Sequence, residues 1–231
     1  MIRIENTEVF GWEAAIRGMR NPMNSWDKSD SYWGLWEDES PINPCDEPFF
    51  FVGENDLKLM KNLSKAGSDH GKFLRMINVT VDITAPLYWY KEFDTYKVGT
   101  VANSCSTMHK IHAKEFTLDD FSHEHLYDGC EDGTGDDEFL YHLERIVDVL
   151  NFARMKFLNT KDKKYWWQMI QLLPSSYNQR RTVQLNYQVL KSMYFARRNH
   201  KLDEWRDLCK WMEGLPYFQE VCIGGTDDAN T

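Results

Sequence analysis

A short run near the middle of the chain most constrains how this sequence can fold. Apolar and polar residues alternate from Ile77 to Ile83, which is the period of a β-strand buried on one face. Residues 87–94 then space their side chains as a helix does, and Pro86 stands in the first turn, where a missing N–H costs nothing. The run therefore predicts a half-buried strand followed at once by a short helix.

Most of the remaining regular structure is predicted to be helical. Residues 1–20 read as a strand followed by a short helix. Further along, apolar side chains recur at helical spacing in five stretches, residues 54–66, 136–160, 165–173, 183–200 and 202–212. Gly67 is expected to cap the first of these stretches. A chain with this pattern can bury a substantial core.

Two long stretches carry loop signals instead. Residues 21–51 hold four prolines and three tryptophans, and prolines oppose long regular elements. We expect the tryptophans to pin this insertion to the core rather than to cap a ligand pocket. Residues 111–135 are rich in glycine and acids, so we expect an exposed excursion. We predict one domain over residues 1–222 and a flexible tail over residues 223–231.

Charge and composition exclude several classes of function. The net charge of −9 argues against a sequence-independent grip on nucleic acid, because Lys and Arg must replace the phosphate counterions. A small ligand with a phosphate group needs only a few converging arginines. No apolar run approaches the roughly 20 residues of a membrane helix, and the first residues lack the apolar region of a signal peptide. We expect a cytoplasmic protein without a membrane or nucleic-acid partner.

Cysteines and histidines do not group into sites. The five cysteines are scattered and form no CxxC pair, which is typical of free thiols in a reducing compartment. His109 and His112, like His123 and His125, lack further ligands at zinc-site spacing. We therefore expect no metal site.

The stretch around the predicted strand resembles the flavin-dependent thymidylate synthases. In that family a strand ends in Ala-Pro, a helix carries Arg-Gln and then Arg-His-Arg, and a loop supplies an Asn and a Ser to the nucleotide. Here Ala85-Pro86 is followed by Lys91-Glu92 in place of Arg-Gln, and by Thr95-Tyr96-Lys97 in place of Arg-His-Arg. Asn103 and Ser106 then stand for the two loop residues.

The last third of the chain carries a second resemblance to the same family, whose members have Leu-Pro, a Tyr, an Arg, Thr-Val, an Asn and a helix ending in Leu-Arg. Residues 173–206 read LPSSYNQRRTVQLNYQVLKSMYFARRNHKLDEWR, in the same order. By this match Arg180, Arg197 and Arg206 stand where the family has arginines that bind nucleotide or flavin. Asn186 falls on the Asn, and His200 falls in the loop.

The resemblance implies a fold, an assembly and a reaction. The fold would be α+β, a mostly antiparallel sheet packed by long helices, in a homotetramer with sites shared between subunits. The reaction would move a one-carbon unit from methylenetetrahydrofolate to C5 of dUMP, with FAD as cofactor and NADPH as reductant. The site residues it implies are Arg206 and Ser106 as catalytic; Glu92, Asn103, Ser104, Ser106 and Arg180 as substrate-binding; and Arg75, Lys97, Asn186, Arg197 and His200 as cofactor-binding.

Elementary chemistry supports the arginines in these roles. Uracil is poorly reactive at C5, so a site must stabilise negative charge at O4 or N3, and a fixed guanidinium does this well. Arg206 is the candidate by position, whereas Arg180 suits the phosphate as a bidentate cation. Ser106 has no visible general base beside it, which leaves it a hydrogen-bonding role.

Two other interpretations stay open. Thr95-Tyr96-Lys97 keeps one cation where the family has two arginines, which motivates a divergent homologue that binds or otherwise modifies a pyrimidine nucleotide without thymidylate synthase activity. The third interpretation is an interaction protein whose aromatic loop, within residues 21–51, is the working surface.

Overall fold

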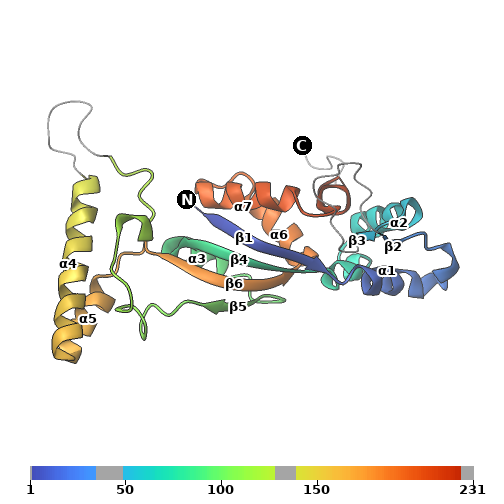
Figure 1. Ribbon diagram of the computed structural model, residues 1–231. Coiled ribbons are helices and arrows are strands. Elements are labelled where there is room, and N and C mark those ends of the chain that lie inside the picture. The colour runs from blue at the N-terminus through green and yellow to red at the C-terminus, as the bar shows by residue number, and fades with distance from the viewer. Residues whose placement is uncertain (1, 35–48, 128–138, 225–231) are drawn as a thin grey trace, which may run out of the picture. The chain divides into compact units, whose positions relative to one another are not determined.

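The computed structural model describes residues 2–34, 49–127 and 139–224 (Figure 1). It combines helices with an antiparallel sheet, which confirms the predicted α+β class. The strands are β1 (Arg3–Phe10), β2 (Tyr32–Gly34), β3 (Phe49–Phe51), β4 (Asn78–Pro86), β5 (Val101–Ser104) and β6 (Asn178–Asn186). The helices are α1 (Trp12–Arg20), α2 (Glu54–Lys65), α3 (Leu87–Phe93), α4 (Phe139–Thr160), α5 (Lys163–Leu172), α6 (Tyr187–Arg197) and α7 (Asp203–Glu213).

Four strands form one sheet in the order β1-β4-β6-β5, and β2 pairs with β3 in a separate antiparallel ribbon. The alternation that predicted β4 is confirmed, because Val79, Val81 and Ile83 are at most 1% exposed and their neighbours are half-buried. The strand passes directly into α3 at Leu87, as expected. No helix in the described part of the chain is long and apolar enough to cross a membrane.

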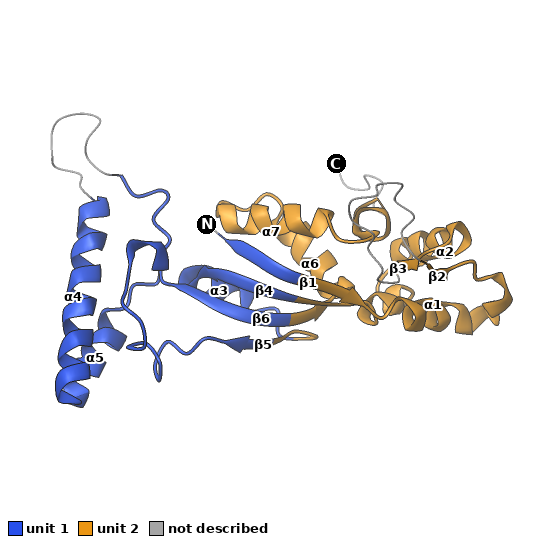
Figure 2. Cartoon of the chain, viewed as in Figure 1, with its two compact units in different colours: residues 1–6, 81–97, 102–183 blue, residues 7–80, 98–101, 184–231 orange. Residues whose placement is uncertain are grey.

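The chain divides into two compact units (Figure 2). Unit 1 comprises residues 1–6, 81–97 and 102–183, and unit 2 comprises residues 7–80, 98–101 and 184–231. The single domain expected over residues 1–222 stays a prediction. Part of the expected insertion, residues 35–48, and most of the expected tail lie outside the described residues.

Unit 1 has a core between α4, α5 and the segment that precedes them. Leu150 of α4 and Met169 of α5 are fully buried in it. The same cluster takes in apolar side chains of the expected excursion, Ile111, Phe116 and Phe121, each at most 4% exposed. The expectation of an exposed stretch is therefore wrong for Ile111, Phe116 and Phe121, whereas most residues between them are exposed or half-buried and residues 128–138 lie outside the described part.

A physical reason explains the error. Three apolar residues at intervals of five match neither the helical nor the strand period, so the pattern in the sequence reads as a loop. The core holds this loop through α4, since the Asn151 side chain accepts from the Phe116 N–H at 2.9 Å and donates to the Phe116 carbonyl at 2.8 Å. Irregular backbone can be buried when its polar groups are paired in this way.

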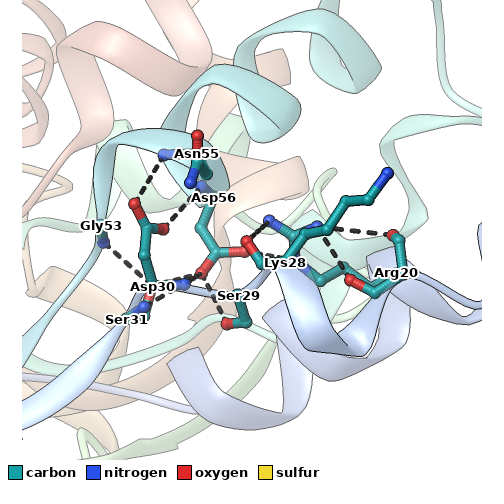
Figure 3. A network of polar contacts seen from close by, with 9 residues as sticks. Arg20, Lys28, Ser29, Asp30, Ser31, Gly53, Asn55 and Asp56 are labelled. Carbon is teal, nitrogen blue, oxygen red and sulfur yellow. Dashed lines mark hydrogen bonds and ion pairs between the residues drawn. The ribbon is translucent and has the colours of Figure 1, made fainter.

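Unit 2 contains a buried ion pair that ties α1 to α2 (Figure 3). Arg20 is 4% exposed and Asp56 is fully buried, and Nε of Arg20 donates to Oδ1 of Asp56 at 2.6 Å. The other Asp56 oxygen accepts from the hydroxyls of Ser29 and Ser31, both at 2.7 Å. Asp30 accepts from the first backbone N–H groups of α2. This cluster of hydrogen bonds holds residues 25–31 against the two helices.

Trp26 and Trp33 do not pin the insertion, contrary to expectation. Their exposed fractions are 52% and 55%, although the Trp33 ring meets that of Phe50 edge to face. Arg20 and Asp56, in contrast, are buried. Trp36 lies outside the described residues. The segment is thus fastened by charge and hydrogen bonds, which a search for apolar anchors does not detect.

The helical pattern expected over residues 183–200 proves to be two elements. Strand β6 continues to Asn186, and α6 begins only at Tyr187. Val183 and Leu185 are buried as alternate residues of the strand. The Asn186 side chain then accepts from the Val189 N–H at 3.1 Å and so caps α6.

Replacing Arg20 by methionine should destabilise the protein severely. The substitution leaves the Asp56 carboxylate buried without its cation, and breaking such a pair costs about 3–5 kcal/mol. Chemical denaturation measures the free energy of unfolding. Arg145→Ala is the matched control, because its pair with Asp148 is exposed and is expected to contribute at most about 1 kcal/mol. Equal effects of the two substitutions would contradict the importance of the buried pair.

The Asp56 carboxylate should also make stability depend on pH. Burial raises the pKa of Asp56, but hydrogen bonds from Ser31, Ser29 and Arg20 together bring it below its usual value. A lowered pKa means that the stabilisation is complete above the ordinary range of aspartate and is lost as the pH falls through the folded-state pKa. The difference in unfolding free energy between wild type and Asp56→Asn should therefore shrink on acidification, as denaturation at several pH values would reveal.

Candidate functional site

Unit 1 contains a cavity of about 870 Å³ beside the strands of the sheet. Thr84 of β4, Cys105 and Ser106 after β5, and Arg180 of β6 line one part of it. Residues of the 110–124 segment line another part, and Ile2, Arg3, Tyr177 and Asn178 complete the lining. The cavity therefore joins four stretches of the sequence, residues 2–3, 84, 105–124 and 177–180.

Aromatic rings form an apolar wall of this cavity. Tyr177 and Phe121 meet edge to face with ring centroids 5.6 Å apart, and Phe116 lies 6.3 Å from Tyr177 in the same way. Burial raises the pKa of Tyr177, and the charge of Asp120 raises it further, so its phenol stays protonated and can donate a hydrogen bond. Such a wall suits a flat, partly apolar ring.

The rim of the cavity is charged with both signs. The acidic residues are Asp119, Asp120 and Glu124, and the basic ones are Arg3, Lys110, Lys114 and Arg180. Lys114 pairs with Asp120, and Arg3 with Glu5. Arg180 pairs with two acids outside the 119–124 segment, Asp82 at 2.7 Å and Glu5 at 3.8 Å.

Asp82 on β4 orients the Arg180 side chain. Nη2 of Arg180 donates to Oδ2 of Asp82 at 2.7 Å, and the same oxygen accepts from Nδ2 of Asn6 at 2.9 Å. The other oxygen, Oδ1, accepts from the Thr182 hydroxyl at 2.5 Å. The hydroxyl, the guanidinium and the amide hold the pKa of Asp82 far below its usual range, so the carboxylate stays ionised. Because a guanidinium has five N–H donors, Asp82 directs Arg180 without using all of them.

The loop after β5 carries Ser106 into the cavity. Its Oγ accepts from the backbone N–H of His109 at 2.8 Å and of Met108 at 3.3 Å, so the hydroxyl proton remains to be donated. The Cys105 N–H donates to the Arg180 carbonyl at 2.9 Å. Two predicted site residues, Ser106 and Arg180, thus line one cavity.

The other predicted substrate contacts lie elsewhere in unit 1. Asn103 and Ser104 belong to β5 and are exposed, and Glu92 lies on α3, where its carbonyl accepts from the Thr95 hydroxyl at 2.7 Å. None of the three is among the residues that line the cavity. Lys97, predicted to contact the cofactor, is exposed in the segment after α3.

Three predicted residues of unit 2 meet at the turn between α6 and α7. The Arg197 guanidinium lies over the Trp205 ring, 4.8 Å from its centroid, and Nδ1 of His200 accepts from the Leu202 N–H at 3.2 Å. Arg206 donates to the carbonyls of His200 at 2.8 Å and Lys201 at 3.1 Å, and it pairs with Asp203. The structure brings these residues together and gives Arg206 a role in holding the turn.

The remaining predicted cofactor residues of unit 2 are separate from that turn in the sequence. Arg75 ends a short helical segment, Gly71–Arg75, and is exposed. Asn186 is 9% exposed and caps α6. A Cβ at Gly99 would lie 2.8 Å from Nδ2 of Asn186, so the turn before β5 packs directly against this amide.

Sequence reasoning missed Asp82, Cys105 and Tyr177 as site residues. Asp82 occupies a polar position of the predicted strand and so reads as solvent-facing, and Cys105 reads as one of five scattered thiols. Tyr177 is distinguished in the sequence only as part of a motif. A basic residue facing an acidic one across two strands is the available signal, but it requires the strand pairing to be known.

Cys105 should be the most reactive of the three cysteines that the structure describes. It is exposed, whereas Cys209 and Cys222 are buried. Burial raises the pKa of Cys209 to about 11 and that of Cys222 to about 12, and the thiolate is the reactive form. Iodoacetamide should label the Cys105 peptide first, as mass spectrometry would measure. Protein unfolded in urea is the control, in which all three peptides should react alike.

Among the described residues, no group of three or more His, Cys, Asp or Glu side chains is arranged to hold a metal ion.

Comparison with solved structures relates this fold to known proteins. A flavin-dependent thymidylate synthase from Helicobacter pylori, complexed with FAD and dUMP, superposes with a TM-score of 0.65 at 15% identity, covering 97% of this chain and 100% of that one. A second structure of thymidylate synthase X from the same organism with FAD and dUMP gives 0.64 at 14% identity, covering 97% and 99%. A UMP/dUMP methylase from Streptomyces cacaoi, bound with 5-Br dUMP, gives 0.59 at 14% identity, covering 96% and 93%.

No protein-family model and no curated protein matches the sequence. The likeness is thus one of three-dimensional structure over almost the whole chain, at an identity of 14–15%. This chain has the fold of the flavin-dependent thymidylate synthases.

Proposed function

We propose that this chain is an enzyme that binds a uridine-type monophosphate and methylates it at C5, converting dUMP to dTMP. Methylenetetrahydrofolate would supply the one-carbon unit, with FAD as the redox cofactor and NADPH as its reductant. One observation carries the proposal. Ser106 and Arg180 come from distant stretches and line the same cavity, in a chain with the fold of enzymes solved with FAD and dUMP.

The cavity offers a suitable group for each part of the nucleotide. Arg180 is 45% exposed and is directed by Asp82, so it can present N–H donors to a phosphate. Tyr177 and Phe121 provide apolar ring surface for the uracil. The free proton of Ser106 can be donated to a carbonyl oxygen of the base, because its oxygen already accepts two backbone N–H groups.

Arg206 is the proposed residue for the charge that develops on uracil as C5 reacts. The carbonyls of His200 and Lys201 hold its guanidinium, and carbonyl contacts position a cation without neutralising it. Asp203 offsets part of the charge. A fixed guanidinium lowers the barrier because it is in place before the charge appears.

The donor set at the α6–α7 turn fits the diphosphate of FAD. Arg197 and His200 lie there and can offer N–H donors to phosphate oxygens, while Arg206 braces the same turn. Arg75 and Lys97 are exposed cations proposed for the same ligand, and Asn186 keeps an amide NH₂ beyond its capping contact. When bound, FAD supplies the reducing equivalents that convert the transferred one-carbon unit to a methyl group.

The experiment that tests the proposal is complementation of a thymidine-requiring strain, with absorbance of the purified protein recorded after addition of FAD. Growth without thymidine, together with a flavin spectrum retained after gel filtration, is expected. Growth dependent on thymidine and no retained flavin would overturn the methylation step. In that case dUMP binding would favour the divergent homologue, whose motivation is Thr95-Tyr96-Lys97 in place of Arg-His-Arg.

Arg180→Ala should weaken dUMP binding by about tenfold or more, because charge-assisted hydrogen bonds to phosphate are the strong ones. Isothermal titration calorimetry measures the affinity. Arg145→Ala is the matched control, since Arg145 is exposed on α4 and does not line the cavity. An unchanged affinity in Arg180→Ala would remove Arg180 from the site.

We also propose that the chain forms a homo-oligomer, a tetramer, in which copies pack through α4. Ile146, Val149, Phe152 and Met155 are 37–56% exposed and recur every three residues along the helix. Such a row forms a ridge that packs into the groove of another helix. Exposed apolar rows of this kind mark interaction surfaces.

The double substitution Val149→Glu and Phe152→Glu should dissociate the oligomer, because it places two charges in the proposed contact. Multi-angle light scattering measures the mass, and circular dichroism verifies the fold. Asn159→Glu, an exposed position at the end of the same helix, should leave the mass unchanged. A wild-type protein that is monomeric at working concentration would contradict the assembly.

A further inference from the structure

Arg181, next to the proposed phosphate ligand, is held rigidly in unit 1. Neighbouring residues of a strand point to opposite faces, so Arg181 does not share the surroundings of Arg180. Its guanidinium lies 3.7 Å from the centroid of the Tyr90 ring, and Nη1 donates to Oδ1 of Asp94 at 2.6 Å. The side chain is only 13% exposed. Stacking and the ion pair together leave it one orientation.

The rigid Arg181 determines how the Gln179 amide is turned. Nε of Arg181 donates to Oε1 of Gln179 at 2.9 Å. A guanidinium can only donate, so the amide oxygen must face it and the amide nitrogen must face the other way. That nitrogen donates to the Cys105 carbonyl at 2.7 Å. Gln179 is 6% exposed, which excludes water as an easy substitute for either contact.

Both backbone polar groups of Cys105, the N–H and the carbonyl, are therefore held by hydrogen bonds. Its N–H donates to the Arg180 carbonyl, and its carbonyl accepts from Gln179. Ser106 follows directly in the chain and carries its hydroxyl to the cavity. We propose that Gln179 and Arg181 are positioning residues for nucleotide binding, which set the Cys105–Ser106 backbone in the conformation that the nucleotide requires. This inference rests on the proposed function.

Two hydrogen bonds, from Arg181 to Gln179 and from Gln179 to the Cys105 carbonyl, form what we call the relay. Gln179→Glu tests this relay with the smallest change of side-chain shape. The carboxylate still accepts from Arg181, but it cannot donate to the Cys105 carbonyl and places an oxygen against it. The Cys105–Ser106 segment is then expected to leave its nucleotide-binding conformation for part of the time. The apparent affinity for dUMP falls in proportion to the fraction of molecules that keep this conformation. Losing one partner of a buried hydrogen bond corresponds to a change on the order of tenfold in affinity.

The experiment measures how dUMP slows the alkylation of Cys105 by iodoacetamide, read from the Cys105 peptide by mass spectrometry. The dUMP concentration for half-maximal protection should rise on the order of tenfold in Gln179→Glu and also in Arg181→Met, which lacks the Nε donor. Gln184→Glu, an exposed Gln of the same strand, and Arg145→Lys on α4 are the matched controls and should behave as wild type. Thermal unfolding of each variant is recorded in parallel.

The outcomes separate this inference from the proposed function. Weaker protection in Gln179→Glu at an unchanged unfolding midpoint supports a positioning role, because a merely structural residue would lower the midpoint instead. Equal protection of Gln179→Glu and wild type overturns the relay while leaving dUMP binding in place. If dUMP does not protect Cys105 in the wild type, the proposed function is overturned. The proposed positioning role of Gln179 and Arg181 in nucleotide binding is then overturned as well.

Discussion

The placement of β6 between β4 and β5 is the constraint on which the candidate site depends. The side chains of successive residues of β6 point to opposite faces of the sheet. Arg180 and Thr182 reach Asp82 on β4, whereas Gln179 and Arg181 serve the Cys105 carbonyl and the end of α3. A shift of the register by one residue would exchange the two sets. The charge that faces the cavity and the contacts that hold its loop are thus specified by the same pairing.

Elements with a clear apolar period could be predicted from the sequence. Strand β4 and its passage into α3 follow from the alternation between Ile77 and Ile83 and from Pro86, and α2 and α4 follow from their apolar stripes. These signals are local, because each element buries one face and its own residues reveal which. The long pattern from Val183 onward predicts only a helix, because the apolar residues of a strand that passes into a helix without a break also fall at helical spacing.

The interactions that could not be predicted join residues far apart in the chain. The ion pair of Arg20 and Asp56, and the burial of Phe116 and Phe121 beneath α4, depend on which elements become neighbours. Motif matching singles out Ser106 and Arg180, and these two residues line one cavity. It did not reveal that Asn186 caps a helix or that Arg206 braces a turn. Position in a motif identifies a residue but not the partners that its side chain will find.

The polar cluster in unit 2 changes how residues 25–31 should be regarded. They belong to the proline-rich stretch that the sequence predicts to be a loop, and such a stretch is a natural candidate for trimming. Ser29, Ser31 and the backbone of Asp30 nevertheless supply donors to Asp56, and Arg20 donates to the carbonyls of Ser25 and Lys28. A shortened protein would carry an acid in its interior that lacks most of its donors. This part of the insertion is therefore integral to the folding unit rather than an appendage to it.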